Sequence, residues 1–393
     1  MDQSTFTWLA YSEREQQRAQ NLASTLSDRE TRDELGIGSI RDAIADRLFP
    51  GTSTIQSRAR YFLFIPWLFQ ELERHPKSRA RERSERAERT LITALKNSND
   101  TRGLVGGRTI LVERLPSSVY WGGLATLGIR RVRRGLGVYY RWLDDPRRAT
   151  RVARDDDGVA VEGVVQTWWD RVPPKPPDFP EVASFALSSV DASYLKGKAA
   201  EATPYPTILA YLFDAGRPDA MAALPWDHPQ RPSMPPVVRD DLDVAEQFSL
   251  LHYGAALLYN QLIAEAREDL VHIDRYRAEL AAWQAASGSA IEGIDLQRIW
   301  QLAPKASPGA KRFVQDWQQS VRRASGRSLT DDRAARDLVE SREIRVKGRQ
   351  RSRIAAPFRV AWAGASGSAR LDYRWGSSVQ RIALDVAEGR FRA

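Results

Sequence analysis

The chain has no cysteine among its 393 residues and only four histidines. The absence of cysteine excludes disulfide bonds, thiolate catalysis and zinc sites with cysteine ligands. The histidines are His75, His228, His252 and His272, and no two of them have the spacing of a local metal-binding pair. We therefore expect neither a metal site nor a cofactor.

Enzyme motifs are missing too. The nearest approach to a nucleotide-binding P-loop, Lys196-Gly197-Lys198, lacks the upstream glycine and the hydroxyl residue that such a loop needs. The signatures of zinc proteases, serine hydrolases, protein kinases and restriction-type nucleases do not occur. These absences favour a protein without catalytic residues, and they leave open a nuclease whose carboxylates are dispersed.

No long apolar run is present. The longest, Tyr61–Phe69, is too short to cross a bilayer, and the first residues do not have the pattern of a signal peptide. With 42% hydrophobic and 28% charged residues, the composition is typical of a soluble globular protein. We therefore expect a cytoplasmic protein without a membrane partner.

Arginine, in contrast, is abundant. It accounts for 51 of the 59 basic residues, and the formal net charge is +9. Residues 201–300 nevertheless contain 15 acidic and 7 basic residues, a local net charge of −8, so the rest of the chain carries +17. Such segregation predicts a face that attracts a polyanion, unless the uneven charge has no function.

The highest concentration of positive charge is the stretch 128–154, with nine basic and two acidic residues. Arginine binds phosphate through paired donors, and aromatic rings stack on bases. The stretch predicts nucleic-acid contacts at Arg130, Arg131, Arg133, Arg134 and Arg141. Its candidate base-stacking rings are Tyr139, Tyr140 and Trp142.

The local pattern around these arginines resembles a winged helix. A helix that follows Pro116 is ended by Gly128, and two short strands are expected at 129–134 and 138–142, on either side of Gly135-Leu136-Gly137. The fold prediction is a mainly α-helical, multi-domain protein with a winged-helix-like basic α+β module in its N-terminal half. The alternative is a small α+β module whose arginines only face water.

Two further segments are relevant to DNA binding. Residues 37–74 read as helix, turn, helix with Arg58 and Arg60 early in the second helix, which fits a DNA-reading motif or, since Tyr61–Phe69 is so apolar, a buried helical hairpin. Residues 342–353 hold six basic residues and one acidic residue, and predict either a second contact or a solvated tail. The predicted contacts of this basic stripe are Arg345, Lys347, Arg349, Arg351 and Arg353.

Changes in composition predict five regions. They are an N-terminal helical region at 1–100, the basic winged-helix-like module at 101–172, a Pro-rich linker at 173–180, an acidic helical domain at 181–328 and a C-terminal region at 329–393 with the basic stripe.

Several stretches resemble an uncharacterised bacterial domain family of unknown function, loosely associated with anti-phage defence gene clusters. They lie at residues 5–15, 32–67, 114–130, 340–348 and 371–375. The resemblance implies an accessory or DNA-engaging protein that acts alongside helicases and nucleases, and it assigns no active site.

Together these observations predict a non-catalytic DNA-binding accessory protein that contacts the phosphate backbone of duplex DNA. Two alternatives stay open. One is a protein-interaction subunit without DNA contact, which would use the acidic 201–300 region and the apolar helix near 250–262. The other is an RNA or single-strand binder that would use the aromatic rings.

Overall fold

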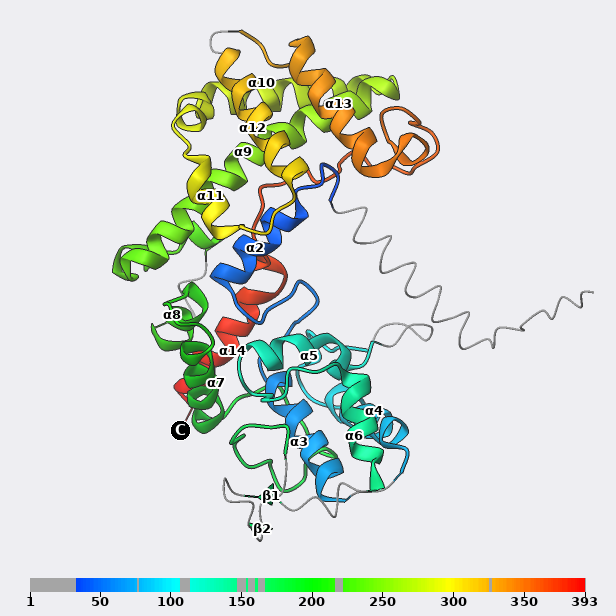
Figure 1. Ribbon diagram of the computed structural model, residues 1–393, viewed down its shortest axis with the longest axis vertical. Coiled ribbons are helices and arrows are strands. Elements are labelled where there is room, and N and C mark those ends of the chain that lie inside the picture. The colour runs from blue at the N-terminus through cyan, green and yellow to red at the C-terminus, as the bar shows by residue number, and fades with distance from the viewer. Residues whose placement is uncertain are drawn as a thin grey trace, which may run out of the picture. The chain divides into compact units, whose positions relative to one another are not determined.

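The computed structural model describes residues 33–75, 78–106, 114–146, 153–154, 160–161, 167–215, 222–324 and 327–392. Within these residues the chain is mainly helical, as predicted (Figure 1). The only strand ladder described there joins two-residue strands, β1 (Ala153–Arg154) and β2 (Ala160–Val161), in antiparallel register.

The chain forms two compact units. The described residues of the first unit lie within 1–41 and 247–371, and those of the second unit lie within 42–246 and 372–393. Two of the three boundaries fall inside helices, α2 (Gly38–Leu48) and α9 (Pro236–Ala266), and the third lies in the loop before residue 372. Each unit thus combines stretches that are distant in sequence, and the division into five consecutive regions stays a prediction.

The first unit is a helical bundle whose helices begin at capping side chains. Besides the second part of α9 it contains α10 (Leu270–Glu292), α11 (Leu296–Leu302), α12 (Pro308–Arg323), α13 (Arg333–Lys347) and the short turn η4 (Arg349–Arg351). The first backbone N–H groups of a helix have no acceptor within the helix itself. In α10 to α13 one side chain before each helix accepts such an N–H group: Asp269, Asp295, Ser307 and Asp332, respectively.

Close packing of α10 on α9 depends on one glycine. A Cβ atom at Gly254 of α9 would lie 2.2 Å from the Trp283 ring of α10, so any other residue would push the ring away. The Trp283 indole N–H also donates to the Leu250 carbonyl at 3.1 Å. The aromatic ring thereby fixes the two helices against each other.

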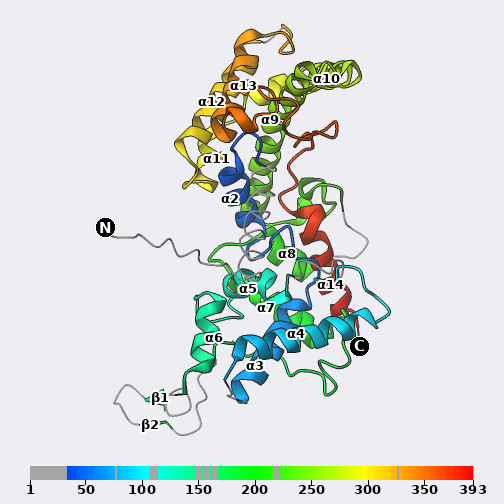
Figure 2. The same ribbon diagram turned by 90° about the vertical axis from the view of Figure 1, so that its right-hand side faces the viewer.

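One part of the second unit is built around α3 (Tyr61–Arg74), which is buried along nearly its whole length. This confirms the expectation that most of this apolar helix lies in the core. Three helices surround it: α4 (Ala80–Lys96), α5 (Pro116–Thr126) and α6 (Leu136–Asp144), of which α4 and α5 contact α3 and α6 contacts α4 (Figure 2).

In the same unit α7 (Ser189–Glu201), α8 (Ile208–Ala215) and α14 (Gln380–Arg390) pack together. Short turns lie at η2 (Pro225–Asp227), η3 (Arg231–Ser233) and η5 (Trp375–Val379). The Pro-rich segment 173–180 is held against α3, because the Trp67 indole donates to the Pro173 carbonyl and the buried Phe179 ring stacks on Phe64.

The predicted winged-helix hairpin is wrong. Residues 138–142, expected as a strand, lie within helix α6, and Gly135, expected in the hairpin turn, precedes the first residue of that helix. Residues 129–134 form a loop with a single bridge from Arg130 to Trp169. The buried side chains of α6 are Tyr139, Tyr140 and Leu143, which have the spacing of one helix face. The five residues 138–142 are too few for their apolar pattern to distinguish a strand from a helix.

Helix α5 is held in place by a buried carboxyl group. Glu88 of α4 is fully buried and accepts the Ser117 backbone N–H at 2.7 Å and the Ser117 hydroxyl at 2.8 Å, at the start of α5. Burial outweighs these hydrogen bonds and raises the pKa of Glu88 from 4.5 to about 7.

This pKa predicts a pH dependence of stability. Because the folded-state pKa is raised, the proton on Glu88 stabilises the fold at low pH, and that stability is lost as pH rises from 4.5 through about 7. We expect the free energy of unfolding of the native protein, relative to that of Glu88→Gln, to fall by roughly 2 to 3 kcal/mol between pH 5 and pH 8. Urea titrations at both pH values measure it. The exposed Glu82→Gln on the same helix is the control and should show no such change.

Candidate functional site

The loop between α5 and α6 is folded around the side chain of Arg130. Gly128 leaves α5 with φ +68°, a conformation that favours glycine. The Arg130 guanidinium then donates to the carbonyls of Trp121 at 3.0 Å, of Arg134 at 2.9 Å and of Val132. The loop is therefore organised by one arginine rather than by a strand ladder.

Arg130 is a buried cation without a counter-ion. Its side chain is 4% exposed, its guanidinium lies 4.3 Å from the Trp121 ring centre, and no carboxylate pairs with it among the described residues. Its Nε also finds no acceptor there. Burial, assisted by the nearby charge of Arg133, lowers the pKa of Arg130 to about 10. The fold thus holds a positive charge that no carboxylate of the described residues neutralises.

A pocket of about 480 Å³ opens beside this charge. It is lined by Trp121, Ala125, Thr126, Arg130, Arg133, Arg134, Gly135 and Ala202, and we call it the arginine pocket. No carboxylate is found among the described residues that line it. Arg133 and Arg134 are exposed, and neither forms an ion pair within the described part of the chain. Gly135 leads into α6, whose first turn has no acidic residue.

The other two predicted contacts of this stretch differ in their surroundings. Arg141 is exposed on α6 and has no carboxylate within ion-pair distance among the residues that the structure describes. Arg131 is exposed too, but it pairs with Asp170 at 2.7 Å, and Asp170 also holds Lys198 at 2.6 Å. Arg131 is therefore already neutralised, whereas Arg133, Arg134 and Arg141 have no such carboxylate partner in the described part of the chain.

The rings predicted to stack on bases lie mostly inside the protein. Tyr139 is fully buried, stacks on Phe69 and donates its hydroxyl to Glu73 at 3.0 Å. Tyr140 is buried with its hydroxyl 3.1 Å from Ser84 Oγ, and Trp142 is half-buried 5.6 Å from the Tyr139 ring. Because Tyr139 and Tyr140 are buried in core contacts, neither ring has an open face for stacking on an unpaired base.

The C-terminal basic stripe is divided in the same way. Arg345, Arg349 and Arg351 are exposed in the first unit. Lys347 and Arg353, in contrast, turn inward to the buried carboxylates of Glu34 and Glu343. The alternation of basic residues in the sequence therefore mixes surface charges with charges that hold the fold together.

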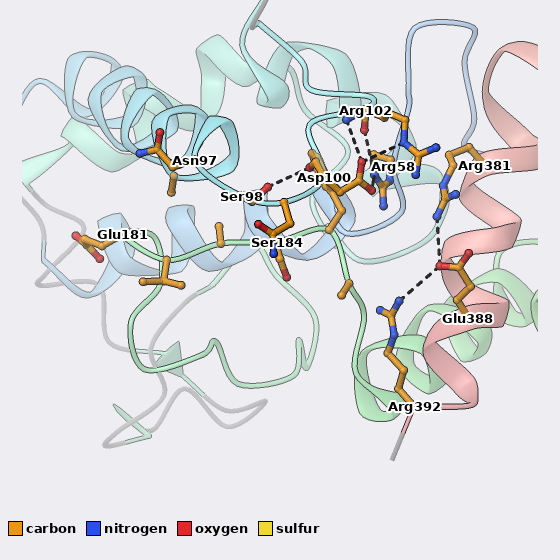
Figure 3. A pocket seen from close by; sticks show the side chains of 16 residues that line it. Arg58, Asn97, Ser98, Asp100, Arg102, Glu181, Ser184, Arg381, Glu388 and Arg392 are labelled. Atoms are coloured by element: carbon orange, nitrogen blue, oxygen red, sulfur yellow. Dashed lines mark hydrogen bonds and ion pairs between the residues drawn. The ribbon is translucent and has the colours of Figure 1, made fainter.

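A second pocket, of about 630 Å³, shows what a neutralised arginine cluster looks like (Figure 3). Its four arginines all have carboxylate partners: Arg58 has Asp385 and Asp100, Arg102 has Asp100, and Arg381 and Arg392 both reach Glu388. Sequence reasoning missed this cluster, because Arg58 and Asp385 are separated by 327 positions and neither lies in a motif. With its charges paired, the pocket has no excess of positive charge to offer an anion.

The expected contribution of Arg130 is structural as well as electrostatic. Arg130→Met should lower the free energy of unfolding by about 2 to 3 kcal/mol, because it leaves three loop carbonyls without their charged donor. The control is Arg131→Ala, whose exposed ion pair contributes at most about 1 kcal/mol. Guanidinium titrations of the two variants measure the difference, and equal effects would contradict the role given to Arg130.

The described residues contain no group of three or more His, Cys, Asp or Glu side chains arranged to hold a metal ion. None of the helices described there is long and apolar enough to cross a bilayer.

A family model described as "Family of unknown function (DUF6361)" matches residues 3–388. No curated protein and no solved structure matches the chain. Because the match extends over nearly the whole sequence, the chain belongs to this family of unknown function, DUF6361.

Proposed function

We propose that this protein is a non-catalytic DNA-binding accessory protein that binds the phosphate backbone of duplex DNA. The contact surface is formed by Arg133, Arg134 and Arg141. The observation that carries the proposal is that no carboxylate of the described residues pairs with these exposed arginines, whereas the arginines of the second pocket and the buried Arg353 are paired with acids.

Charge pairing decides which arginines can bind phosphate. An arginine already paired with a carboxylate must give up that partner before it binds a phosphate, so little free energy is gained. An exposed arginine without a partner neutralises a phosphate and releases its counterion to the solvent. By this criterion the contact set narrows from the five arginines predicted at 130–141 to three, with Arg345 and Arg349 as a second contact in the first unit.

The biological setting that we propose rests on the resemblance to proteins of anti-phage defence gene clusters. A protein that binds duplex DNA without cleaving it would recruit or position partner enzymes such as helicases and nucleases. Duplex is favoured over single strands because Tyr139 and Tyr140 are buried and offer no stacking platform.

Fluorescence anisotropy with labelled duplex and single-stranded DNA, titrated from low to physiological salt, tests the proposal. We expect the duplex to bind more tightly and its affinity to fall steeply with salt. Absence of binding at low salt would contradict the proposal. Tighter binding of single strands would replace it with the single-strand alternative.

One observation favours the protein-interaction alternative. Leu270, Val271 and Phe358, all in the first unit, expose 73%, 75% and 81% of their surface, which is unusual for large apolar side chains. The helix segment 250–262, considered for this role from the sequence, is instead mostly buried. Salt-insensitive assembly with a partner protein, lost in Phe358→Ser and unaffected by duplex DNA, would support this alternative.

A further inference from the structure

We propose that the arginine pocket binds a terminal phosphate monoester, the 5′-phosphate at the end of a DNA strand. This inference rests on the proposed function, and it adds to backbone binding a specific recognition of DNA ends.

The shape of the site favours a terminal phosphate over an internal one. Phosphodiesters within a duplex follow a continuous backbone and meet a protein surface side by side. A recess of about 480 Å³ has a size usual for pockets that take small ligands, and it admits a group that projects from the end of a strand. Arg133 and Arg134 therefore contact both the terminal phosphate in the pocket and the internal phosphates of the backbone next to it.

The charge of the site favours a dianion. A terminal phosphate carries close to two negative charges at neutral pH, whereas each internal phosphodiester carries one. Three arginines and no carboxylate are among the described residues that line the pocket, and one of the arginines, Arg130, is buried. A positive charge that is shielded from water attracts an anion more strongly than an exposed one does.

The site is also rigid before any ligand arrives. Three carbonyls hold the Arg130 guanidinium, so little conformational entropy is lost when an anion binds next to it. The pocket reaches Gly135 at the start of α6, where the first N–H groups of a nine-residue helix have no acceptor within the helix. A Cβ at Gly135 or Gly137 would meet no atom within 4 Å, so this approach is open.

The test compares two blunt duplexes of the same sequence, one with 5′-phosphates and one with 5′-hydroxyl groups, each labelled at a 3′ end. We expect the phosphorylated duplex to bind native protein at least about tenfold more tightly, as one or two added charge-assisted hydrogen bonds would give. In Arg134→Ala this ratio should fall towards one. The loop should survive the change, because Arg130 and Trp121 bind the Arg134 carbonyl and not its side chain.

The control variant is Arg333→Ala, which removes a charge of the same kind from α13, where the side chain is 94% exposed and 3.8 Å from Asp337. It should keep the full preference for the phosphorylated duplex. Circular dichroism of both variants establishes that they are folded.

The outcomes separate the two proposals. Equal, salt-sensitive binding of both duplexes overturns the end-recognition inference and leaves the proposed function standing. If neither duplex binds, the proposed function fails. The phosphorus NMR spectrum of thymidine 5′-monophosphate, recorded with the protein present, then tests the pocket alone. Line broadening that Arg134→Ala abolishes supports a phosphate-monoester site, whereas unchanged spectra overturn it.

Discussion

Replacing Arg133, Arg134 and Arg141 together with glutamine is expected to weaken duplex DNA binding about 500-fold at about 0.1 M salt. Each phosphate contact contributes about 0.9 to the slope of log K against log salt concentration, so the slope should become shallower by about 2.7. Over one decade of salt concentration, from about 1 M to about 0.1 M, a slope difference of about 2.7 corresponds to a difference in affinity of about 500-fold. Anisotropy titrations at several salt concentrations measure both quantities.

A second triple variant removes the same amount of charge from other exposed arginines. Arg79, Arg102 and Arg333 are 81%, 87% and 94% exposed, and each lies within 4 Å of a carboxylate. Because those carboxylates already offset their charge, we expect less than a tenfold loss of affinity. If both triple variants lose affinity equally, net charge alone governs binding and the assignment of the contact surface is wrong.

Lys347→Met is expected to destabilise the first unit by about 3 to 5 kcal/mol and to affect DNA binding only through folding. The Lys347 ammonium donates to Glu34, to Glu343 at 3.2 Å and to the Tyr259 hydroxyl at 2.9 Å, and both carboxylates are buried. Without Lys347, Arg353 is the one cation among the described residues that still pairs with this cluster of two buried carboxylates. Removing one partner from a buried ion pair costs this much because it leaves charge uncompensated.

The effect of Lys347→Met should depend on pH. Burial alone would raise the pKa of Glu34, but the hydrogen bonds and charges of Lys347 and then of Arg353 outweigh it and keep the pKa below its ordinary value. A lowered folded-state pKa stabilises the fold above the unfolded value of about 4.5, and this stability is lost as pH falls through the folded value. The destabilisation by Lys347→Met should therefore be large at pH 7 and shrink below about pH 4.5.

Thermal and urea unfolding at pH 7 and pH 4 measure this difference. The control is Arg345→Ala on the same helix, whose side chain is exposed and should change stability by less than about 0.5 kcal/mol. A stable Lys347→Met protein with weakened DNA binding would contradict the structural role and restore Lys347 as a contact.

The sequence by itself determined that the protein is mainly helical and that the Tyr61–Phe69 segment lies in the core. Both follow from local physics, since apolar residues repeat at helical spacing and a continuous apolar run must be buried. The sequence also placed the excess of arginine in the 128–154 stretch, where the arginine pocket is found. It misjudged the local structure there, because five residues of α6 fit a strand pattern as well as a helical one.

Only the tertiary structure decided which arginines are available to a ligand. Arg353 and Arg349 are equivalent in the sequence pattern, yet one is buried against Glu34, 319 positions away, while the other faces solvent. Arg130 and Arg133 are three positions apart, and only the fold shows that the first is enclosed by loop carbonyls. Charge pairing and burial are set by residues distant in the chain, so no reading of neighbouring residues could separate structural arginines from those free to bind phosphate.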